Sequence, residues 1–297
     1  MKFSVVVPTF NRPDTLRQTL DALRQQDYED YEVIVVDDGS RAEVGLMVKS
    51  EFPEVRYLYQ ENKGPGAARN RGWRAAVGEI VAFTDDDCAP PPDWLSRTAD
   101  GYRRHPQAVG VGGYQEASEE VLAANAIARY EAYIWRTHWP DYQNEYLGGE
   151  ECPAGATNSM SYKRAVLEEV GGFSEELREA SFEDSMLKWK VTDLGYKLLY
   201  IPVKVVHLRL YTWADFRKQQ QSYARGAIRM NDYYHVPVSH KAMVFRLFGR
   251  IKKIKRIFKL DPSLLYVKIA GACYVMLAEW KETHRIALDK DRKQTRN

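Results

Sequence analysis

The sequence has few cysteines: three in 297 residues, at positions 88, 152 and 273. An odd number of widely spaced cysteines argues against a disulfide framework and against a zinc site. It favours a reducing compartment, so we expect a cytoplasmic protein. Residues 1–8 contain one basic side chain and only a short apolar run, which predicts a first strand rather than a signal peptide.

The sequence also lacks a large net charge. Its 43 Lys and Arg residues nearly balance its 41 Asp and Glu residues, which leaves +2. The chain as a whole therefore has no strong attraction to nucleic acid, and we expect no nucleic-acid partner. Internal repeats and low-complexity linkers are absent as well. With 44% hydrophobic residues the chain can bury a sizeable core, which suits one large α/β domain plus an appendage.

What the sequence does have is an alternation of apolar runs and helical segments in its first third. Between the runs the apolar residues have helical spacing, as with Leu16, Leu20 and Leu23 after Asp14, which we expect to cap that helix. Helices between strands predict a mostly parallel, Rossmann-like α/β sheet flanked by helices. The predicted strands are 3–7, 31–36, 55–59 and 79–83.

Polar residues follow three of these strands. Asp85, Asp86 and Asp87 come almost directly after the apolar run 81–83. Adjacent carboxylates repel one another, and a cation that prefers hard oxygen ligands, Mg²⁺ or Mn²⁺, would relieve that repulsion. A solvated acidic turn is the alternative. Open α/β sheets bind ligands at the carboxyl ends of their strands, so the convergence favours a metal–diphosphate site. The other two strand ends carry Thr9, Asn11 and Arg12, and Asp37 and Asp38.

The second half of the sequence has fewer clear strands. We expect a strand at 109–113, a helical segment at 119–147, and a last strand at 198–206 that breaks at Pro202. The segment 119–147 is rich in aromatic residues, which either form a platform for sugar rings or pack on the domain, and we favour packing. These aromatics are Tyr130, Tyr133, Trp135, Trp139, Tyr142 and Tyr146.

Two further segments of this half carry polar residues. The small, polar run 155–164 predicts a loop and strand that line a cavity. A helix is expected from Phe182 to about Gly195, with Glu183 and Asp184 in its first turn. Acids at that position also suit the helix dipole, which is the structural alternative to a catalytic role.

Taken together, these pieces resemble the family 2 inverting glycosyltransferases, which have the GT-A fold. The matching segments occur in the family's order and cover roughly residues 3–230. One acidic cluster would be weak evidence, but the ordered set is strong. The segments are VVVPTFNR at 5–12, VVDDGS at 35–40, GAARN at 66–70, DDD at 85–87, GGF at 171–173, ED at 183–184, and His207.

The resemblance implies roles for the acidic residues. Asp184 matches the general base, which takes a proton from the acceptor hydroxyl. Asp85 and Asp87 match the D-x-D motif, with Asp87 the usual metal ligand, and Asp86 is an alternative because the triple Asp leaves the register open. His207 lies where related enzymes place a metal or diphosphate contact, although a histidine satisfied at a strand end explains it equally well.

The resemblance also implies two sets of binding residues. The expected acceptor-side residues are Thr157, Asn158 and Glu183. The expected donor-binding residues are Pro8, Thr9, Asn11, Arg12, Asp38, Arg69, Asp85 and Asp86.

The implied function is metal-dependent, inverting transfer of a sugar from a nucleotide sugar, most favourably a UDP-sugar, to a hydroxyl of a glycan or lipid-linked acceptor. Mn²⁺ or Mg²⁺ would stabilise the leaving diphosphate. One alternative is a sugar-phosphate nucleotidyltransferase, whose glycine-rich loop is missing from 8–13, while the loop at 64–66 matches no dinucleotide or P-loop pattern. The other is a non-catalytic, membrane-associated nucleotide-binding protein, against which the intact Asp87 and Asp184 argue.

The last part of the sequence predicts a membrane surface contact. Residues 240–260 contain no acid, and their apolar and basic residues alternate at helical spacing, which suits an anionic membrane. The segment 264–280 is shorter than the roughly 20 residues of a spanning helix. We expect a catalytic domain at 1–235, with halves 1–90 and 91–235, and a membrane-associating segment at 236–297 on the inner face of the cell membrane. A helix pair packed on the catalytic domain is the alternative.

Overall fold

The computed structural model describes residues 1–176, 182–233 and 262–294. The chain forms two compact units, each described here by itself. The first comprises Met1–Ser118 and Trp135–Arg209, and the second comprises Glu119–Ile134 and the described residues from Leu210 onward. The predicted domain boundary at 235/236 falls outside the described residues and stays a prediction.

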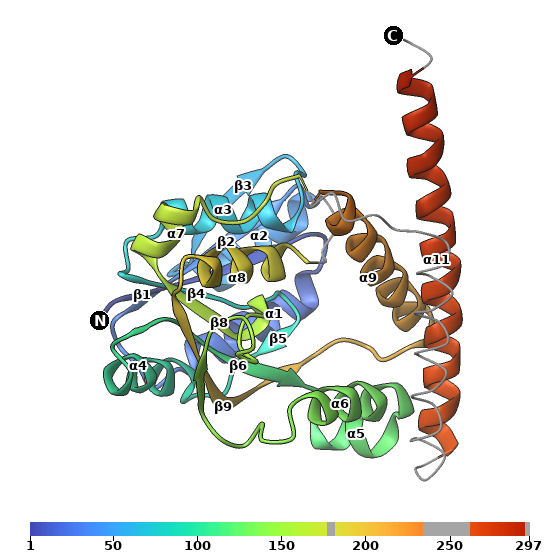
Figure 1. Cartoon of the computed structure of the whole chain (residues 1–297). Coiled ribbons are helices and arrows are strands. Elements are labelled where there is room, and N and C mark those ends of the chain that lie inside the picture. The colour runs from blue at the N-terminus through green and yellow to red at the C-terminus, as the bar shows by residue number, and fades with distance from the viewer. Residues whose placement is uncertain (177–181, 234–261, 295–297) are drawn as a thin grey trace. The chain divides into compact units, whose positions relative to one another are not determined.

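The first unit is built on one sheet (Figure 1). Its strand order is β3-β2-β1-β4-β8-β6-β9-β5, and β7 also pairs with β9. The strands are β1 Phe3–Thr9, β2 Tyr31–Asp38, β3 Arg56–Gln60, β4 Ile80–Phe83, β5 Cys88–Ala89, β6 Ala108–Glu116, β7 Tyr146–Gly148, β8 Met160–Lys163 and β9 Lys197–His207.

The sheet is mixed, so the prediction of a mostly parallel sheet is wrong for its second half. The strands β1, β2, β3 and β4 run parallel, as do β6 and β9. However, β8 runs antiparallel between β4 and β6, and β5 and β7 run antiparallel to β9. Parallel pairs need a crossover connection, usually a helix, and the second half of the chain does not alternate strand and helix as the first half does.

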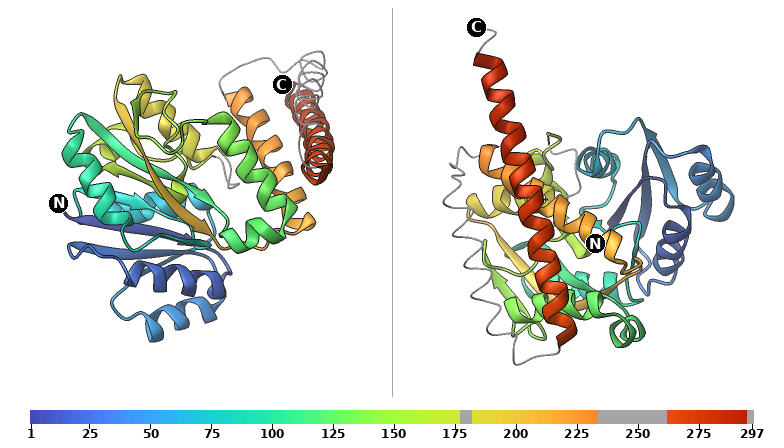
Figure 2. Two further views of the ribbon diagram at one scale, coloured as in Figure 1. Left: turned by 90° about the horizontal axis from the view of Figure 1, so that it is seen from below. Right: turned by 90° about the vertical axis from the view of Figure 1, so that its right-hand side faces the viewer.

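Helices cover both faces of this sheet (Figures 1 and 2). Side chains alternate across a strand, so Val5 and Val7 of β1 enter one apolar core while Val6 enters the other. The first core includes α1 Pro13–Arg24, α2 Ala42–Glu51 and α4 Trp94–Arg104, and the second includes α3 Pro65–Ala75, α7 Arg164–Val170 and α8 Glu183–Asp193. Burial on both faces explains why β1 and β2 are almost continuously apolar.

Three local predictions need correction. The helix α1 begins at Pro13 with Arg12 at its N-cap, and Asp14 lies in its first turn instead of capping it. The segment 119–147 is not one helix: it holds α5 Glu119–Ala124, α6 Ala126–His138 and then β7. Strand β9 does not break at Pro202, because its pairing with β6 shifts register there, and such an irregularity tolerates a proline.

Two aromatic residues of this segment, Trp135 and Tyr142, pack on Tyr114 of β6 in the first unit. Trp135 stacks on Tyr114 with ring centroids 6.1 Å apart, and Tyr142 meets Tyr114 edge-on at 5.7 Å. The Tyr200 hydroxyl donates to the Tyr142 carbonyl oxygen. The prediction of packing is confirmed for Trp135 and Tyr142.

In the second unit, α9 Trp213–Tyr233 packs against α11 Pro262–Gln294. Leu264, Val267, Val275 and Ala278 of α11 are buried, whereas Tyr266, Ile269, Met276 and Leu277 are exposed. Within the described residues, no helix combines the length and apolar character that a membrane span requires. The basic stretch 240–260 lies outside the described residues, so the predicted membrane-associating segment is not confirmed.

Candidate active site

The carboxyl ends of β1, β2 and β4 meet at one edge of the sheet, because the three strands are parallel and adjacent. Thr9 at the end of β1 donates a hydrogen bond from Oγ1 to Asp86 Oδ2 at 2.7 Å, just after β4. Pro8, the residue before Thr9, lies opposite Val36 of β2. The structure therefore brings together the strand ends that the sequence analysis grouped.

Arg12 connects the acidic cluster to the N-cap of α1. Its Nη1 atom lies 3.1 Å from Asp86 Oδ1 and 2.8 Å from Asp87 Oδ2. The two carboxylates are nearly buried, at 5% and 9% exposure. One guanidinium therefore compensates two adjacent acids that could not both stay ionised in this environment without a cation. Arg12 belongs to the acidic cluster directly and is not limited to the donor-binding role predicted for it.

The two carboxyl groups differ in their affinity for a proton. Burial raises the pKa of Asp86 to about 6, although Arg12 opposes the shift. Burial also acts on Asp87, but there His207 and Arg12 outweigh it and lower the pKa to about 2. Asp87 is therefore the carboxylate that stays ionised under mildly acidic conditions, which suits a metal ligand.

His207, the last residue of β9, also reaches the acidic cluster. Cys88 of β5 and His207 of β9 are directly opposite in an antiparallel pair, so their side chains lie on the same face. His207 Nε2 lies 3.6 Å from Asp87 Oδ1. Asp87, Cys88 and His207 each offer one ligand atom, and these atoms lie within 4.8 Å of one another. The structure thus places His207 beside Asp87 and adds Cys88, which the sequence analysis did not assign to the site.

Asp38 at the end of β2 organises the loop before α3. Its Oδ1 atom accepts hydrogen bonds from Gln60 Nε2 at 2.7 Å and the Lys63 amide at 2.9 Å, and its Oδ2 atom accepts one from the Gly64 amide at 2.8 Å. These three bonds hold the loop that leads into α3. Gly64 has a φ of +93°, a conformation that favours glycine.

The turn after β1 is held in a strained conformation. Asn11 has a φ of +55°, which is uncommon for a residue other than glycine. Its amide donates to Ser40 Oγ at 2.8 Å, and its Oδ1 atom accepts from the Arg41 amide at 3.0 Å. Backbone strain of this kind persists where the surroundings fix it, often at ligand sites. Asn11 therefore ties the β1 and β2 ends together.

Arg69 of α3 lies between the donor-side and acceptor-side residues. It is 4% exposed, with Nη2 2.6 Å from Asp85 Oδ1 and Nη1 2.7 Å from Glu183 Oε1. Burial would lower the pKa of Arg69, but Asp85 and Glu183 outweigh it and raise that pKa. The two predicted sets of binding residues are therefore joined by one buried ion-pair network.

Asp184 lies at the start of α8, beside this network. Its Oδ1 atom accepts a hydrogen bond from the Ser185 amide at 2.7 Å, and among the described residues its Oδ2 atom has no partner. Burial raises the pKa of Asp184, and burial raises that of Glu183 as well. Phe182, which precedes them, has a φ of +71°, so the helix begins from a strained residue.

Several buried polar atoms near these residues lack partners. Thr157 and Asn158 lie in a short 3-10 helix before β8, and the Thr84 hydroxyl donates to the Asn158 carbonyl oxygen at 3.0 Å. Asn158 Oδ1, Glu183 Oε2 and Arg69 Nε have no hydrogen-bond partner within the described chain. Each such atom costs about 1–3 kcal/mol, so each calls for a ligand or water.

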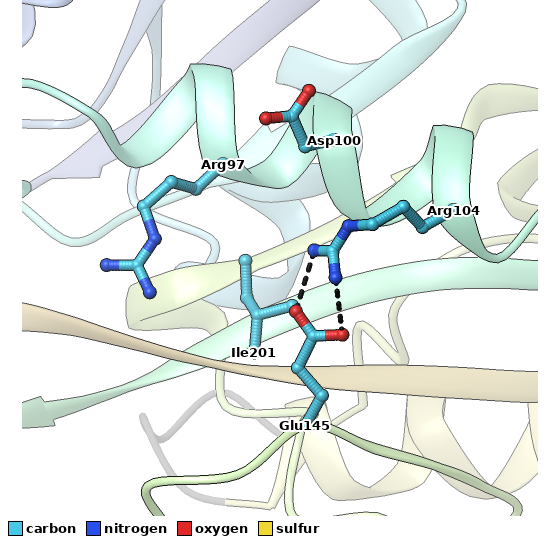
Figure 3. Close-up of a pocket in the computed structure, with 5 residues that line it drawn as sticks. All are labelled: Arg97, Asp100, Arg104, Glu145 and Ile201. Carbon is cyan, nitrogen blue, oxygen red and sulfur yellow. Dashed lines mark hydrogen bonds and ion pairs between the residues drawn. The ribbon is translucent and has the colours of Figure 1, made fainter.

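A separate hollow on the flank of the first unit does not resemble a site (Figure 3). It has a volume of about 260 Å³ and is lined by Arg97, Asp100, Arg104, Glu145 and Ile201. Arg104 and Glu145 form a bidentate pair at 2.6 and 2.7 Å. Its other charged groups also have partners, since Arg97 donates to the Pro202 carbonyl oxygen and Asp100 accepts from Arg103, unlike the unpartnered atoms at the sheet edge.

Comparison with known proteins agrees with this geometry. The model of the family described as "Glycosyl transferase family 2" matches residues 4–171. A glucosyl-dolichyl phosphate glucuronosyltransferase from Haloferax volcanii is 25% identical, over 94% of this chain and 93% of that protein. A pre-mycofactocin glycosyltransferase from Mycobacterium tuberculosis is 31% identical over 68% of this chain, which spans 42% of that relative's length.

Among solved structures, a mannosyltransferase from Pyrobaculum calidifontis in complex with GDP-Man and Mn²⁺ superposes with a TM-score of 0.58. The match covers 97% of this chain and 75% of that one at 19% identity, so it bears on the fold alone. It confirms the expected GT-A-like α/β fold. Because the family model matches more than half of the chain, this protein is a glycosyltransferase that belongs to glycosyl transferase family 2.

Proposed function

We propose that the chain transfers a sugar from a UDP-sugar to a hydroxyl of a lipid-linked glycan, with inversion at the anomeric carbon and with Mn²⁺ or Mg²⁺ bound at Asp87. The proposal rests on two neighbouring groups of residues. In the first, Asp87 pairs with Arg12 and His207. In the second, Arg69 pairs with Glu183, the residue before Asp184. The departure of a diphosphate needs the site at Asp87, and deprotonation of the acceptor hydroxyl needs a base such as Asp184.

The residues at the sheet edge fit a divalent cation. Asp87 Oδ2 is bound to Arg12, and Oδ1 faces His207, so a carboxylate oxygen and an imidazole nitrogen converge. Asp87 and His207 would hold the ion, with Asp85 an additional oxygen ligand near the donor. When bound, the ion would supply charge stabilisation for the departing diphosphate. Asp86, fixed by Thr9 and Arg12, would position the cluster instead of ligating the metal.

The other donor contacts follow from the strand ends. Pro8, Thr9 and Asn11 line the end of β1, and Asp38 fixes the loop that leads into α3. The N-terminus of α3 is suited to phosphate oxygens, because a helix N-terminus presents unpaired N–H groups and a positive dipole end. Arg69 pairs through Nη2 with Asp85 and through Nη1 with Glu183, so its proposed role is to orient these two acids around the donor.

Asp184 is the proposed base for the acceptor hydroxyl. The Ser185 amide fixes Oδ1 and leaves Oδ2 to accept the proton. Burial raises the pKa of Asp184, and a carboxylate with a raised pKa is a stronger base once ionised. A single base suffices for inversion, because the acceptor oxygen attacks the anomeric carbon directly on the face opposite the departing diphosphate. Thr157, Asn158 and Glu183 are proposed to contact the acceptor.

The test is transfer from UDP-sugars to polyprenyl-linked glycans, with Mn²⁺ or with a chelator, and determination of the product anomer by NMR. The proposal expects metal-dependent transfer with inversion. Asp184→Asn should bind donor like the parent chain and lose turnover, whereas Asp14→Asn, an exposed acid of α1, is the matched control. Normal turnover by Asp184→Asn, or retention at the anomeric carbon, would refute the assigned base.

A lipid-linked acceptor also supports location at an anionic membrane surface. The relative from Haloferax volcanii is named for a dolichyl phosphate acceptor. In this chain, the basic stretch 240–260 precedes α11, which exposes Tyr266, Ile269 and Met276. Replacing Lys252, Lys253 and Lys255 by Glu should abolish flotation with anionic liposomes. The control Lys281→Glu, which changes an exposed lysine of α11, should not abolish it. Equal flotation of both variants would count against the membrane contact.

A further inference from the structure

The loop before the short 3-10 helix is tied to the helix that carries Asp184. This 149–156 loop follows β7, and all of its residues are described and lie outside helices and strands. Within the loop, the Cys152 amide donates to the Gly149 carbonyl oxygen at 3.1 Å. Lys188 of α8 donates from Nζ to the Cys152 carbonyl oxygen. The loop is therefore held by a bond from another element as well as by one of its own.

Lys188 and Asp184 lie on the same face of α8, because residues four positions apart on a helix are neighbours. Leu187 and Val191 also lie toward this face, and they are buried in the same apolar core as Cys152. A single helix thus carries the proposed base and holds the 149–156 loop one turn farther along.

The loop contacts Lys188 at a second point, near its end. Gly155 has a φ of +146°, a conformation that favours glycine. A Cβ atom at this position would lie 2.8 Å from Lys188 Cδ, so the lysine stem passes directly over the glycine. The amine and the stem of one side chain therefore hold the loop at Cys152 and at Gly155.

The loop leads directly into the residues that we propose to contact the acceptor. Thr157 and Asn158 are buried in the 3-10 helix that follows it. The Thr84 hydroxyl, just after β4, donates to the Asn158 carbonyl oxygen at 3.0 Å. Lys188 fixes the other end of this segment at α8. The backbone from 152 to 158 is thereby held in a set position relative to Asp184.

The surroundings of Lys188 favour this role over the binding of an anion. Its side chain is half-buried, and burial lowers the pKa of Lys188, while Cys152 and three nearby acids oppose the shift. These acids are Glu150, Glu151 and Asp184. They would repel a phosphate group, whereas a backbone carbonyl oxygen accepts a hydrogen bond from the amine in either protonation state.

We propose that Lys188 is a positioning residue that sets the acceptor-binding segment, including Thr157 and Asn158, at the correct distance from Asp184. The inference rests on the proposed function, because it assumes that the acceptor hydroxyl meets Asp184. Without the bond to Cys152, the 149–156 loop is no longer held against α8 and the acceptor binds less tightly. The donor contacts should be unaffected, since they come from the ends of β1, β2 and β4. Small displacements of a bound substrate are costly in rate.

The test compares Lys188→Met with Lys190→Met. Lys190 is the matched control because it lies on the same helix, is half-buried, and donates to the Gly172 carbonyl oxygen at 3.3 Å. Loss of a hydrogen bond from a charged donor predicts that Lys188→Met raises the KM for the acceptor roughly ten-fold, with the KM for the donor unchanged. Lys190→Met should leave both KM values unchanged. Lys188→Arg, which keeps a charged donor, should return the acceptor KM toward that of the parent chain.

Hydrogen exchange measured by mass spectrometry tests the same bond without catalysis. Amides of the 149–156 loop should exchange faster in Lys188→Met than in the parent chain, and at the parent rate in Lys190→Met. If Lys188→Met does not fold, Lys188→Gln replaces it under the same criteria.

An unchanged acceptor KM, an equal rise in the KM for the donor, or unchanged exchange of the 149–156 loop would overturn the inference. If the parent chain transfers no sugar, the proposed function fails, and the exchange result then decides by itself whether Lys188 holds the loop. If the parent chain transfers sugar and Lys188→Met does so with the parent's acceptor KM, the proposed function stands and only the role of Lys188 is refuted.

Discussion

Removal of Arg69 should destabilise the fold because it leaves Asp85 and Glu183 without their shared cation. Breaking a buried ion pair by deleting one partner costs about 3–5 kcal/mol. The Asp85 side chain is 30% exposed and partly screened, whereas that of Glu183 is 5% exposed, so we expect the low end, about 3 kcal/mol, for Arg69→Met. In a domain of this size that loss lowers Tm by roughly 6–12 °C.

The loss should depend on pH in a defined direction. Burial already raises the pKa of Glu183, with Arg69 opposing the shift, so deletion of Arg69 raises it further. Between the unfolded and folded pKa values the folded state binds a proton that the unfolded state does not. The stability of Arg69→Met should therefore rise as pH falls through that window, and Arg69→Met/Glu183→Gln should recover most of the loss at neutral pH.

Urea unfolding of the parent and variants at about pH 8 and about pH 5 measures both effects. Arg104→Met is the matched control: Arg104 also pairs with an acid, Glu145 at 2.6 Å, but the two side chains are 51% and 30% exposed. It should cost about 1 kcal/mol. The reasoning is refuted if Arg69→Met and Arg69→Met/Glu183→Gln unfold at the same urea concentration at both pH values.

Three other predictions concern the site and the core. Because burial raises the pKa of Asp184 and the base must be ionised, kcat should fall as pH drops through that raised value; a flat kcat profile down to about pH 5 would exclude Asp184 as the base. Asp87→Asn should abolish Mn²⁺-dependent nucleotide binding in calorimetry, whereas Asp86→Asn should retain it, and equal loss would leave the metal register undecided between them. Gly72→Ala would place a Cβ 2.3 Å from Val6 Cγ1 and should cost about 1–3 kcal/mol in urea unfolding, with the exposed Arg71→Ala of the same helix as control.

The first third of the fold could be predicted because local patterns there decide the architecture. In β1, β2 and β4 the apolar runs are short and nearly continuous, since both faces of the sheet are covered. The second half was harder because long-range pairing decides it. Nothing in the residues of β8 shows that this strand lies between β4 and β6 in the antiparallel direction. Pro202 suggests a broken strand, and only the structure shows that β9 accommodates it at a register shift.

The candidate site shows the same division. The convergence of Thr9 with the triple Asp followed from strand order, and the structure confirms their contact. The pairing of Arg69 with Glu183 joins residues 114 positions apart, and no local pattern indicates it. The meeting of Cys88 with His207 was not predicted, because it depends on the pairing of β5 with β9. Sequence patterns identify which side chains carry chemistry, but pairing between distant strands decides which of them meet.

The most direct test of the account is calorimetric titration of the full chain with UDP, GDP and dTDP, each with and without Mn²⁺, in parallel with Asp87→Asn. The account predicts that UDP binds tightly with Mn²⁺, that GDP and dTDP bind more weakly, and that Asp87→Asn removes the metal dependence. Tight binding of GDP or dTDP instead would contradict the proposed donor. Failure of every nucleotide to bind under either condition would contradict the claim that this edge of the sheet is a nucleotide-sugar site.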